Sequence, residues 1–426
     1  MEIKWIVLAS AAIMYLIVII FPQKKAWASL GAALLVIILG VVSPAHALGT
    51  LVNWNILMIY VGSLAIAELF IYSRVPARIA DNIVDHSPNL GIAIVAILIM
   101  TGIISAFVEN VATVLVMAPI ALALSKKLKM DPTYFMVGLA VMANLQGTAT
   151  LVGDPPSMIF ASFANYGFND FFAYNGRPSI FFVVQVGMLA GALFFYVYFA
   201  KRGTEKITIE REPILSMFPT ILLFLMIIGL AICSFLYNGV SLASGLVVLA
   251  LGIIGLFWYR FIRKESRHDT LKMIKGLDWE TILFLIGIFI IVGAISEVGL
   301  LEDFAGFLAG VIGNNVFLGF MVIILVSVLI SGFVDNVPYI IVMLPVAANI
   351  ASGMGLKPEL YMFALLVGSC LGGNLTPFGA SANIVAVGIL KKQNIKLNFH
   401  GWLKIGLPFT IITTAAASLF LWAVWR

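Results

Sequence analysis

The chain is poor in charged residues and has few cysteines and histidines. Only 11% of its 426 residues are charged, whereas 62% are hydrophobic, and the mean hydropathy is +1.10. So small a polar share excludes a soluble globular protein, which needs charged side chains over its surface. Many apolar runs reach the roughly 20 residues that a membrane-spanning helix requires. The composition therefore predicts an all-α polytopic membrane protein of the inner or plasma membrane.

The scarce residue types also exclude several kinds of site. Cys233 and Cys370 both lie in apolar segments, so no disulfide framework is expected. The four histidines are far apart in loops and predict no metal cluster. No ATP-binding motif is present, so neither primary pumping by this chain alone nor a bound cofactor is expected. The positive residues sit in short loops between apolar runs, so nucleic acid is not expected as a partner.

The chain contains nearly the same short amino-acid sequence twice. Residues 105–119 read SAFVENVATVLVMAP, and residues 331–345 read SGFVDNVPYIIVMLP, 226 positions later. The offset persists without a gap, so that Gly153 aligns with Gly379. Such a register indicates an internal duplication. In membrane proteins, paired interrupted segments in the two halves are the best sequence indication of a transport site.

The distribution of positive charge predicts how the two halves are oriented. A topology with five spans and one interrupted hairpin in each half places all but four of the 25 Lys and Arg residues on the cytoplasmic side. Because five is odd, the second half must be inverted relative to the first. We therefore predict two inverted-topology repeats, at 1–200 and 215–426, joined by a charged cytoplasmic linker at 201–214. The stretches 88–125 and 310–352 are interpreted as re-entrant helical hairpins, with two ordinary spans each as the alternative.

Two long apolar segments, 132–162 and 358–390, are interrupted by glycine, proline and small polar residues. Glycine and interior proline both weaken a helix. Unwound backbone at membrane depth is tolerated only where it is buried in protein or faces a water-filled cavity. We therefore predict two broken helices whose interruptions lie at the midplane, with the hairpin tips at Asn110 and Asn336 at the same depth. The alternative is that the small residues merely allow close helix packing.

The polar side chains at these four interruptions are the candidate ligands. Ionisable groups inside spans are costly and usually functional, so the acids among them are the candidate proton carriers. The candidate neutral ligands are Asn110, Asn144, Thr148, Thr150, Ser157, Asn336, Asn374, Thr376, Ser381 and Asn383. The candidate proton-coupling groups are Asp154, Glu109 and Asp335.

Asp154 is the first of these candidates because its equivalent in the second half is Ala380, so the duplication does not require an acid there. It lies at the broken-helix turn, where burial favours the protonated form of a carboxyl group. Glu109 and Asp335 occupy equivalent positions. For them a structural role stays open, in which each accepts backbone N–H groups and holds a hairpin tip.

These motifs resemble the ion transporter superfamily, in its branch of arsenite permeases, NhaD-type sodium–proton antiporters and animal P proteins, with a citrate transporter-like domain. The resemblance covers essentially the whole chain. It is carried by FVENVATVLVMAP and GTATLVGDPPSMI in the first half, and by FVDNVPYIIVMLP and GSCLGGNLTPFGASANIV in the second. It implies a scaffold region and a moving transport region, elevator-type alternating access, and a homodimer.

The resemblance also bears on the hairpin tips. Related dicarboxylate carriers bind sodium through Ser-Asn-Thr motifs at these tips, and this chain shares only the asparagines, Asn110 and Asn336. Sodium is therefore a candidate ligand at both asparagines. The adjacent acids, Glu109 and Asp335, would repel a dicarboxylate.

The function expected from the sequence is secondary active antiport, in which arsenite, antimonite or a similar small inorganic species is exported in exchange for protons. Arsenite near neutral pH is mainly an uncharged hydroxide, which suits hydroxyl and amide ligands. An arsenite exporter would also have a soluble ATPase as a candidate partner. The alternatives are sodium–proton antiport, sodium-coupled transport of an anion or dicarboxylate, and an intramembrane enzyme. The whole-chain duplication argues against the enzyme.

Overall fold

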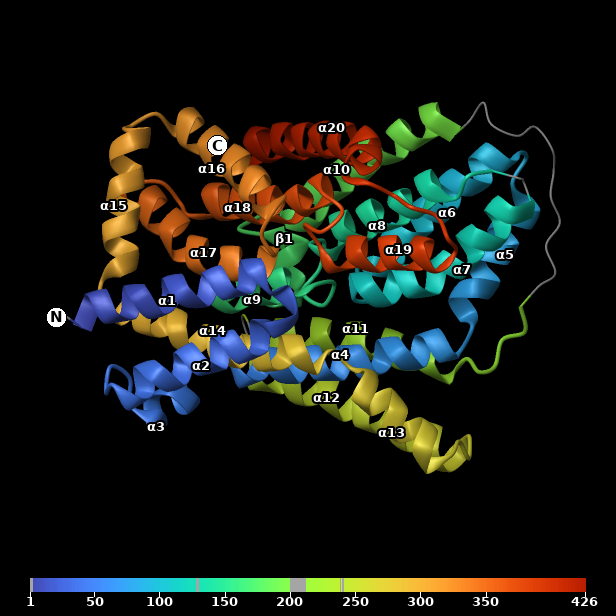
Figure 1. Ribbon diagram of the computed structural model, residues 1–426, viewed down its shortest axis with the longest axis horizontal. Helices are drawn as coiled ribbons and strands as arrows, with labels where there is room; N and C mark the ends of the chain where they lie inside the picture. The colour runs from blue at the N-terminus through green and yellow to red at the C-terminus, as the bar shows by residue number, and fades with distance from the viewer. Residues whose placement is uncertain (1–2, 128–129, 200–211, 238, 240) are drawn as a thin grey trace.

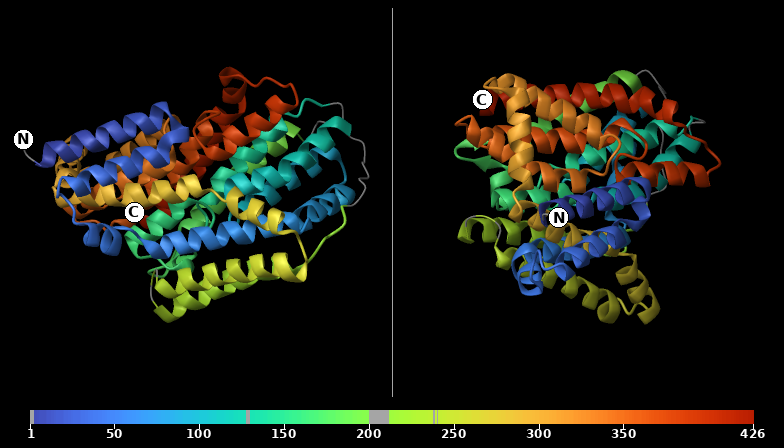
Figure 2. Two further views of the ribbon diagram at one scale, coloured as in Figure 1. Left: turned by 60° about the horizontal axis from the view of Figure 1, so that its bottom comes forward. Right: turned by 60° about the vertical axis from the view of Figure 1, so that its left-hand side comes forward.

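The computed structural model describes residues 3–127, 130–199, 212–237, 239 and 241–426 as an elongated bundle of helices (Figures 1 and 2). Within these ranges, eight helices are long and apolar enough to cross a membrane. The longest of them, α20 (Phe399–Trp425), has 27 residues and measures about 40 Å at 1.5 Å per residue. The predicted all-α polytopic architecture is confirmed.

Six helices form two packed groups, here called the scaffold groups, and each group mixes the two halves of the chain. The first comprises α1 (Ile3–Ile20), α2 (Lys25–Ile38) and α14 (Trp279–Glu297); the second comprises α4 (Trp54–Tyr72), α11 (Phe218–Tyr237) and α12 (Leu242–Phe257). Glycines let these helices approach closely. A Cβ atom on Gly62 of α4 would lie 2.5 Å from the carbonyl oxygen of Val248 on α12. A Cβ atom on Gly287 of α14 would meet the backbone of Ser29 on α2 at the same distance.

Two helical hairpins and two broken helices occupy the centre, and their boundaries follow the duplication. The hairpins are α6 (Leu90–Ser105) with α7 (Asn110–Lys127), and α16 (Val316–Ser331) with α17 (Asn336–Gly353). Both helices of the second hairpin begin and end 226 residues after those of the first. The broken helices are α8 (Thr133–Gly147) with α9 (Pro155–Ala164), and α18 (Glu359–Gly372) with α19 (Ser381–Lys392). Helices α10 (Ile180–Phe199) and α20 pack against each other and complete this region.

The predicted interruptions of the long apolar segments are confirmed as breaks. Helix α9 begins with a proline, which suits the first turn because its missing N–H has no helical partner there. The turn preceding each second half-helix is so tight that only glycine fits. A Cβ atom on Gly153 would lie 2.4 Å from the carbonyl oxygen of Gly147, and one on Gly379 would lie 2.6 Å from that of Gly373.

Each second half-helix crosses to the hairpin of the other half: α9 packs against α17, and α19 packs against α7. Figure 1 shows α6 and α7 toward one end of the molecule and α16 and α17 toward the other. The two hairpins therefore approach the centre from opposite ends, as inverted repeats would. The inversion itself and the repeat boundaries stay predictions. Of the predicted linker at 201–214, residues 201–211 lie outside the described residues.

Short surface elements complete the chain. The remaining helices are α3 (Pro44–His46), α5 (Val75–His86), α13 (Arg267–Gly276) and α15 (Leu300–Ile312), with short 3-10 or π segments at Pro22–Lys24, Ala47–Leu51, Phe168–Phe171 and Trp258–Ile262. A further 3-10 turn, Gly373–Leu375, is buried at the break between α18 and α19. The strands β1 (Ala173–Tyr174) and β2 (Arg177–Pro178) form a small antiparallel hairpin. Its turn residues, Asn175 and Gly176, have φ angles of 50° and 72°, which suits a two-residue hairpin turn. Our sequence analysis did not predict α5 and α15, which occupy equivalent positions in the duplication.

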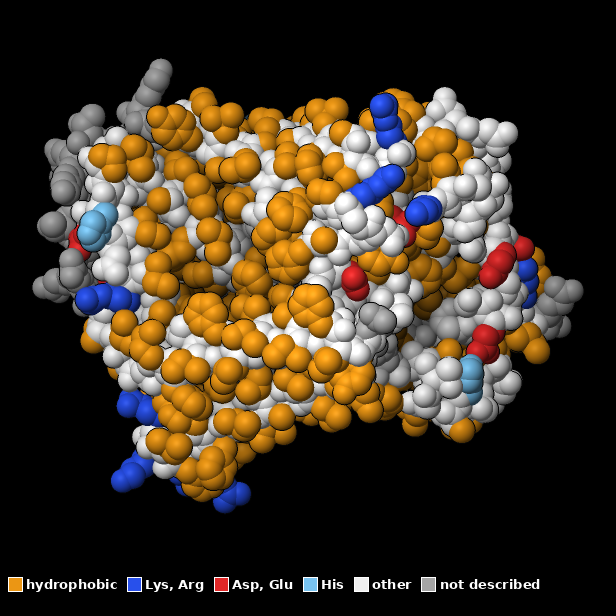
Figure 3. Space-filling view, turned by 180° about the vertical axis from the view of Figure 1, so that it is seen from behind, with side chains coloured by type: hydrophobic (Ala, Val, Ile, Leu, Met, Phe, Trp, Pro, Cys, Tyr) orange, Lys and Arg blue, Asp and Glu red, His pale blue; other side chains and the backbone are white. Residues whose placement is uncertain are grey.

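The surface of the bundle is largely apolar. Figure 3 shows a broad hydrophobic face, with charged side chains at both ends of the molecule and in a further group to the right of its centre. Leu189 on α10, Phe235 on α11 and Leu419 on α20 are among the most exposed large side chains, at 65%, 79% and 72%. Water would oppose such exposure, whereas lipid tails accommodate it. The helices are therefore arranged as a multi-pass membrane protein requires.

Candidate functional site

A small cavity lies where both hairpin tips meet both broken helices and the ends of the scaffold helices. Its volume is about 20 Å³, which is room for a single water-sized species. Asp278 and Ser381 are exposed at its rim, so the cavity opens beside the basic helix α13. The lining residues are Lys25, Tyr60, Glu109, Asn110, Asp154, Pro155, Asp278, Thr281, Asp335, Asn336, Val337, Ala380 and Ser381.

The acids at the two hairpin tips hold the first turns of α7 and α17. The Glu109 carboxylate accepts a hydrogen bond from the backbone N–H of Ala112 at 2.9 Å. Asp335 caps α17 by accepting one from the N–H of Val337 at 3.1 Å. The backbone N–H groups at the start of a helix have no helical partner, so a carboxylate there stabilises the turn. Both acids therefore make the contacts expected for the structural role that the sequence analysis left open. Both also line the cavity.

Asp154 is the N-cap residue of α9, but its side chain makes no capping hydrogen bond. It is 6% exposed and turns toward the hairpin tips. Its Oδ2 accepts a hydrogen bond from Asn110 Nδ2 at 3.2 Å, and Asn336 is close enough to interact with the same carboxylate. The acid of one broken helix thus lies between the asparagines of both hairpin tips. Its equivalent Ala380, the N-cap residue of α19, also lines the cavity.

A chain of buried amides connects the two halves behind the cavity and fixes the orientation of each asparagine. Asn383 Nδ2 donates to the carbonyl oxygens of Gly373 and Thr376 at 2.9 and 2.8 Å, so its Oδ1 must face the other way. That oxygen accepts from Asn144 Nδ2 at 2.7 Å. Asn144 Oδ1 in turn accepts from Asn110 Nδ2 at 3.1 Å. Each assignment follows from the one before, because an amide nitrogen must face an acceptor.

At the end of this chain, Asn110 Oδ1 is buried without a hydrogen-bond partner among the described residues. Turning the amide over would point its oxygen at two acceptors, Asn144 Oδ1 and the Asp154 carboxylate. The oxygen is therefore directed away from them, in a residue that lines the cavity. A buried unpaired carbonyl oxygen is costly unless a ligand completes it. Beside a carboxylate, this oxygen is suited to a cation.

The candidate hydroxyl groups are mostly bound to nearby backbone. Ser157 Oγ donates to the Gly147 carbonyl oxygen at 3.0 Å, and Thr148 Oγ1 donates to that of Leu145 at 3.0 Å. Equivalent bonds recur in the two halves: Thr150 donates to the carbonyl oxygen of Ala106, and Thr376 donates to that of Gly332, 226 positions later. These bonds tie each helix break to its hairpin tip.

The structure thus divides the residues predicted from sequence into two sets. Glu109, Asn110, Asp154, Asp335, Asn336 and Ser381 line the cavity. The others support the lining from behind through the amide and hydroxyl contacts: Asn144, Thr148, Thr150, Ser157, Asn374, Thr376 and Asn383. Asn374 belongs to the amide chain, since its Oδ1 accepts from Asn144 Nδ2 at 2.9 Å.

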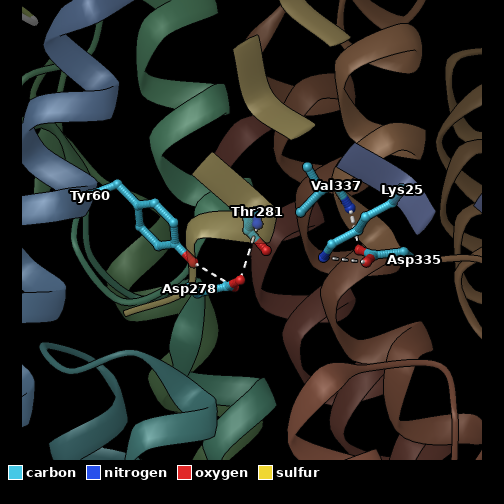
Figure 4. A network of polar contacts seen from close by, with 6 residues as sticks. All are labelled: Lys25, Tyr60, Asp278, Thr281, Asp335 and Val337. Carbon is cyan, nitrogen blue, oxygen red and sulfur yellow. Dashed lines mark hydrogen bonds and ion pairs between the residues drawn. The ribbon is translucent and has the colours of Figure 1, made fainter. Parts of the chain in front are cut away.

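Four polar cavity residues were missed by sequence reasoning, Lys25, Tyr60, Asp278 and Thr281, and all four lie on scaffold helices or their caps (Figure 4). Lys25, the first residue of α2, has a side chain only 13% exposed, and its Nζ lies 3.7 Å from Asp335 Oδ2. Asp278 caps α14 by accepting from the N–H of Thr281 at 3.0 Å. Tyr60 of α4 donates its hydroxyl hydrogen to Asp278 at 3.3 Å. The sequence analysis counted Lys25 only as a cytoplasmic loop charge.

One of the two cysteines lies just behind the lining. Cys370 is 1% exposed on α18, and its Sγ lies 4.0 Å from Asn336 Nδ2. It takes the place that Asn144 has in the first half, so the amide chain ends in a thiol on this side.

Comparison with known proteins agrees with this architecture. Residues 15–368 match the model of the citrate transporter family. The 46 kDa membrane protein of Mycobacterium leprae is 29% identical over 417 residues, which cover 94% of each chain. The human P protein is 23% identical, over 77% of this chain and 48% of the P protein. The crystal structure of the Alcanivorax borkumensis YdaH transporter aligns with 91% of this chain and 87% of its own, at a TM-score of 0.59 and 12% identity.

These matches confirm the resemblance and show that the protein is a transporter and not an enzyme. The family match extends from helix α1 into helix α18, so it includes both hairpin tips and the first broken helix. The chain is therefore a multi-pass membrane transporter that belongs to the citrate transporter family.

Proposed function

We propose that the chain is a secondary active antiporter that exchanges protons for sodium or a similar small monovalent cation. The observation that carries this proposal is the lining of the cavity, where four carboxylates face the single ammonium group of Lys25. When all are ionised, negative charge is in excess within a very small volume. Mutual repulsion in such a site favours the uptake of protons or cations. An anionic substrate would be repelled.

Size and ligand type support a small cation. A cavity of about 20 Å³ accommodates a water-sized ion and not a citrate molecule. The unpaired Asn110 Oδ1 and the Asp154 carboxylate provide the oxygen ligands that a hard cation prefers. Asn336, the equivalent of Asn110 at the second hairpin tip, contacts Cys370 through its side-chain nitrogen Nδ2. The first hairpin tip is therefore the better supported position for sodium.

Asp154 is the group proposed to exchange one ion for the other. Either a proton or a cation at its carboxylate cancels the same buried charge, so the two compete for one position. Competition of this kind couples two opposite ion fluxes when the site is accessible to each side in turn. Glu109 and Asp335 add negative charge on the two sides of Asp154 and are the secondary candidates.

Proton-coupled export of arsenite or antimonite, which the sequence analysis placed first, is the second candidate function. The observation in its favour is the thiol of Cys370, which contacts the cavity-lining residue Asn336 from behind. An uncharged arsenite hydroxide gains little from a lining of carboxylates, so cation exchange ranks above it. Elevator-type movement of the hairpins and broken helices against the scaffold groups, assembly as a homodimer and a soluble ATPase partner stay predictions.

The test is flux in proteoliposomes that enclose a pH-sensitive dye. With an imposed pH gradient, external sodium should collapse the gradient at a rate that saturates with concentration, whereas citrate and arsenite should not. Empty liposomes and the D154N variant are the controls. A gradient collapse driven by arsenite and indifferent to sodium would replace the first candidate with the second, and citrate-driven flux would reject both.

A further inference from the structure

The two hairpin tips are equivalent in sequence but differ in how they contact the scaffold groups. At the first tip, Val108 and Ala112 belong to an apolar cluster with Phe70 and Val75, against which Leu223 of α11 packs. The second tip is also packed in the core, through Val337 and Tyr339, but in addition it makes polar contacts to the first scaffold group, which are described next. Apolar contacts are insensitive to charge, whereas polar contacts across a small acidic cavity depend on which ions occupy it.

Two side chains of the first scaffold group contact the second tip. Tyr15 of α1 donates its hydroxyl hydrogen to the carbonyl oxygen of Pro338 at 3.0 Å. Lys25 of α2 faces Asp335 at 3.7 Å. Pro338 is the equivalent of Ala112, so a hydrogen bond takes the place of an apolar contact. The ion pair is longer than the 2.7–2.9 Å of a charge-assisted hydrogen bond, so it is mainly a Coulombic contact that another cation can displace.

The ammonium group of Lys25 also has acids within reach on its own scaffold group. Helix α2 packs along α14, where Asp278 and Glu280 interact electrostatically with Lys25 and where its Nζ lies 5.7 Å from the centre of the Phe284 ring. Both acids are exposed, and Asp278 also lines the cavity. The charged and titratable groups that face the ammonium are Asp335 on the second tip, Asp278 and Glu280 on α14, Glu109 and Asp154 across the cavity, and Tyr60 on α4.

We propose that Lys25 is a tethered cation that competes with the transported cation for Asp335 and thereby controls the hold of the scaffold on the second hairpin tip. When the site is empty, the ammonium pairs with Asp335 and the tip stays docked. When a cation or proton neutralises Asp335, the ammonium moves to Asp278 and Glu280, and the tip loses one of the two polar contacts described above to the first scaffold group. No covalent bond changes, and one positive charge replaces another at Asp335. The identity of the competing ion rests on the proposed function, whereas the docking contact does not.

The first experiment compares sodium-driven flux in wild type and in K25Q, K25R and K24Q. K25Q removes the competitor, so the half-saturating sodium concentration should fall about threefold to tenfold. K25R retains a tethered cation and should stay near wild type. Lys24 is the matched control, because it carries the same charge in the same turn but is exposed and lies over the ring of Phe21. An equal fall in K24Q and K25Q would mean a general charge effect and would overturn the proposal.

The second experiment needs no substrate and separates this proposal from the proposed function. Hydrogen–deuterium exchange is followed in sodium-free detergent for peptides over 333–341 and over the equivalent 107–115. In K25Q, exchange at 333–341 should rise while 107–115 stays unchanged, and K25R should match wild type. Unchanged exchange at 333–341 in K25Q overturns the proposal whatever the flux shows. If wild type shows no sodium-coupled flux, the proposed function fails, and the exchange comparison still decides whether Lys25 holds the tip.

Discussion

Asp154 and Ala380 occupy equivalent positions in the duplicated halves and line the same cavity, each as the N-cap residue of a second half-helix. The backbone on the two sides is closely alike, down to the recurring hydroxyl bonds of Thr150 and Thr376. The chemical difference between the halves is therefore concentrated in side chains. A symmetrical framework with one additional acid gives the site a single dominant titratable position.

The first prediction concerns that acid. D154N should abolish proton-coupled flux in proteoliposomes, because the amide neither binds a proton at physiological pH nor supplies negative charge. The protein should still fold, since Asn at this position can accept the hydrogen bond from Asn110 Nδ2 that Asp154 accepts now. The control is E302Q, which removes an acid from the exposed helix α15. Wild-type flux in D154N, with normal membrane expression, would reject Asp154 as the coupling group.

The second prediction separates the two roles of Glu109. In E109Q the side-chain oxygen can still accept the N–H of Ala112, so the start of α7 is retained while the charge is lost. E109A loses both the charge and the hydrogen bond. We expect the free energy of unfolding, measured in detergent by thermal unfolding, to be nearly unchanged in E109Q. In E109A it should be lower by about 0.5–2 kcal/mol, the usual cost of a lost helix cap.

Flux then decides whether the carboxylate also takes part in transport. Under the proposed function, E109Q reduces the apparent sodium affinity, because negative charge facing the cavity is lost. If E109Q transports with the affinity of wild type while E109A is unstable, Glu109 serves only to hold the hairpin tip.

The third prediction concerns the amide chain between the halves. N144A removes the donor to Asn374 Oδ1 and Asn383 Oδ1, and one of the two acceptors of Asn110 Nδ2. Buried polar atoms left without partners cost about 1–3 kcal/mol each, so the variant should lose several kcal/mol of stability. T148V is the comparison, since Thr148 donates only within its own helix turn, and it should lose less. Equal melting temperatures for the two variants in detergent would contradict the inferred role of Asn144.

The sequence predicted the features that repeat and missed those that depend on packing. The hairpin tips, the helix breaks and Asp154 all carry local signals: an acid inside an apolar run, or glycine and proline where a helix should continue. Lys25 carries none, because a lysine at the end of an apolar run is the usual mark of a cytoplasmic loop. It faces Asp335 only because the end of α2 packs beside a hairpin tip more than 300 residues away in sequence.

Asp278 and Tyr60 were missed for a similar reason. Asp278 precedes the tryptophan that begins α14, where an acid is expected as a helix cap, and it does serve as one. Its second role, as acceptor of the Tyr60 hydroxyl at the cavity, requires α4 and α14 to meet. Helices α5 and α15 were missed because they are short and carry charges among their apolar residues. Their equivalence under the 226-residue offset is the signal that could have identified both.

The last prediction tests the tight turns that precede α9 and α19 at the site. In G153A the new Cβ atom would lie 2.4 Å from the carbonyl oxygen of Gly147, and in G379A it would lie 2.6 Å from that of Gly373. Backbone must shift in both, at a cost of about 1–3 kcal/mol, as in other overpacked interiors. In the first turn the shift also disturbs Ser157, whose hydroxyl donates to the Gly147 carbonyl oxygen, and Asp154, which follows Gly153 directly.

The matched control is G388A in α19, where no atom lies within 4 Å of the added Cβ. Alanine is favoured over glycine in a helix, so this variant should be as stable as wild type or slightly more stable. Flux should fall further in G153A than in G379A, because the first turn positions the acid and the second positions Ala380. Equal flux in the two variants at matched stability would mean that both turns contribute alike, and that the site is more symmetrical in function than it is in sequence.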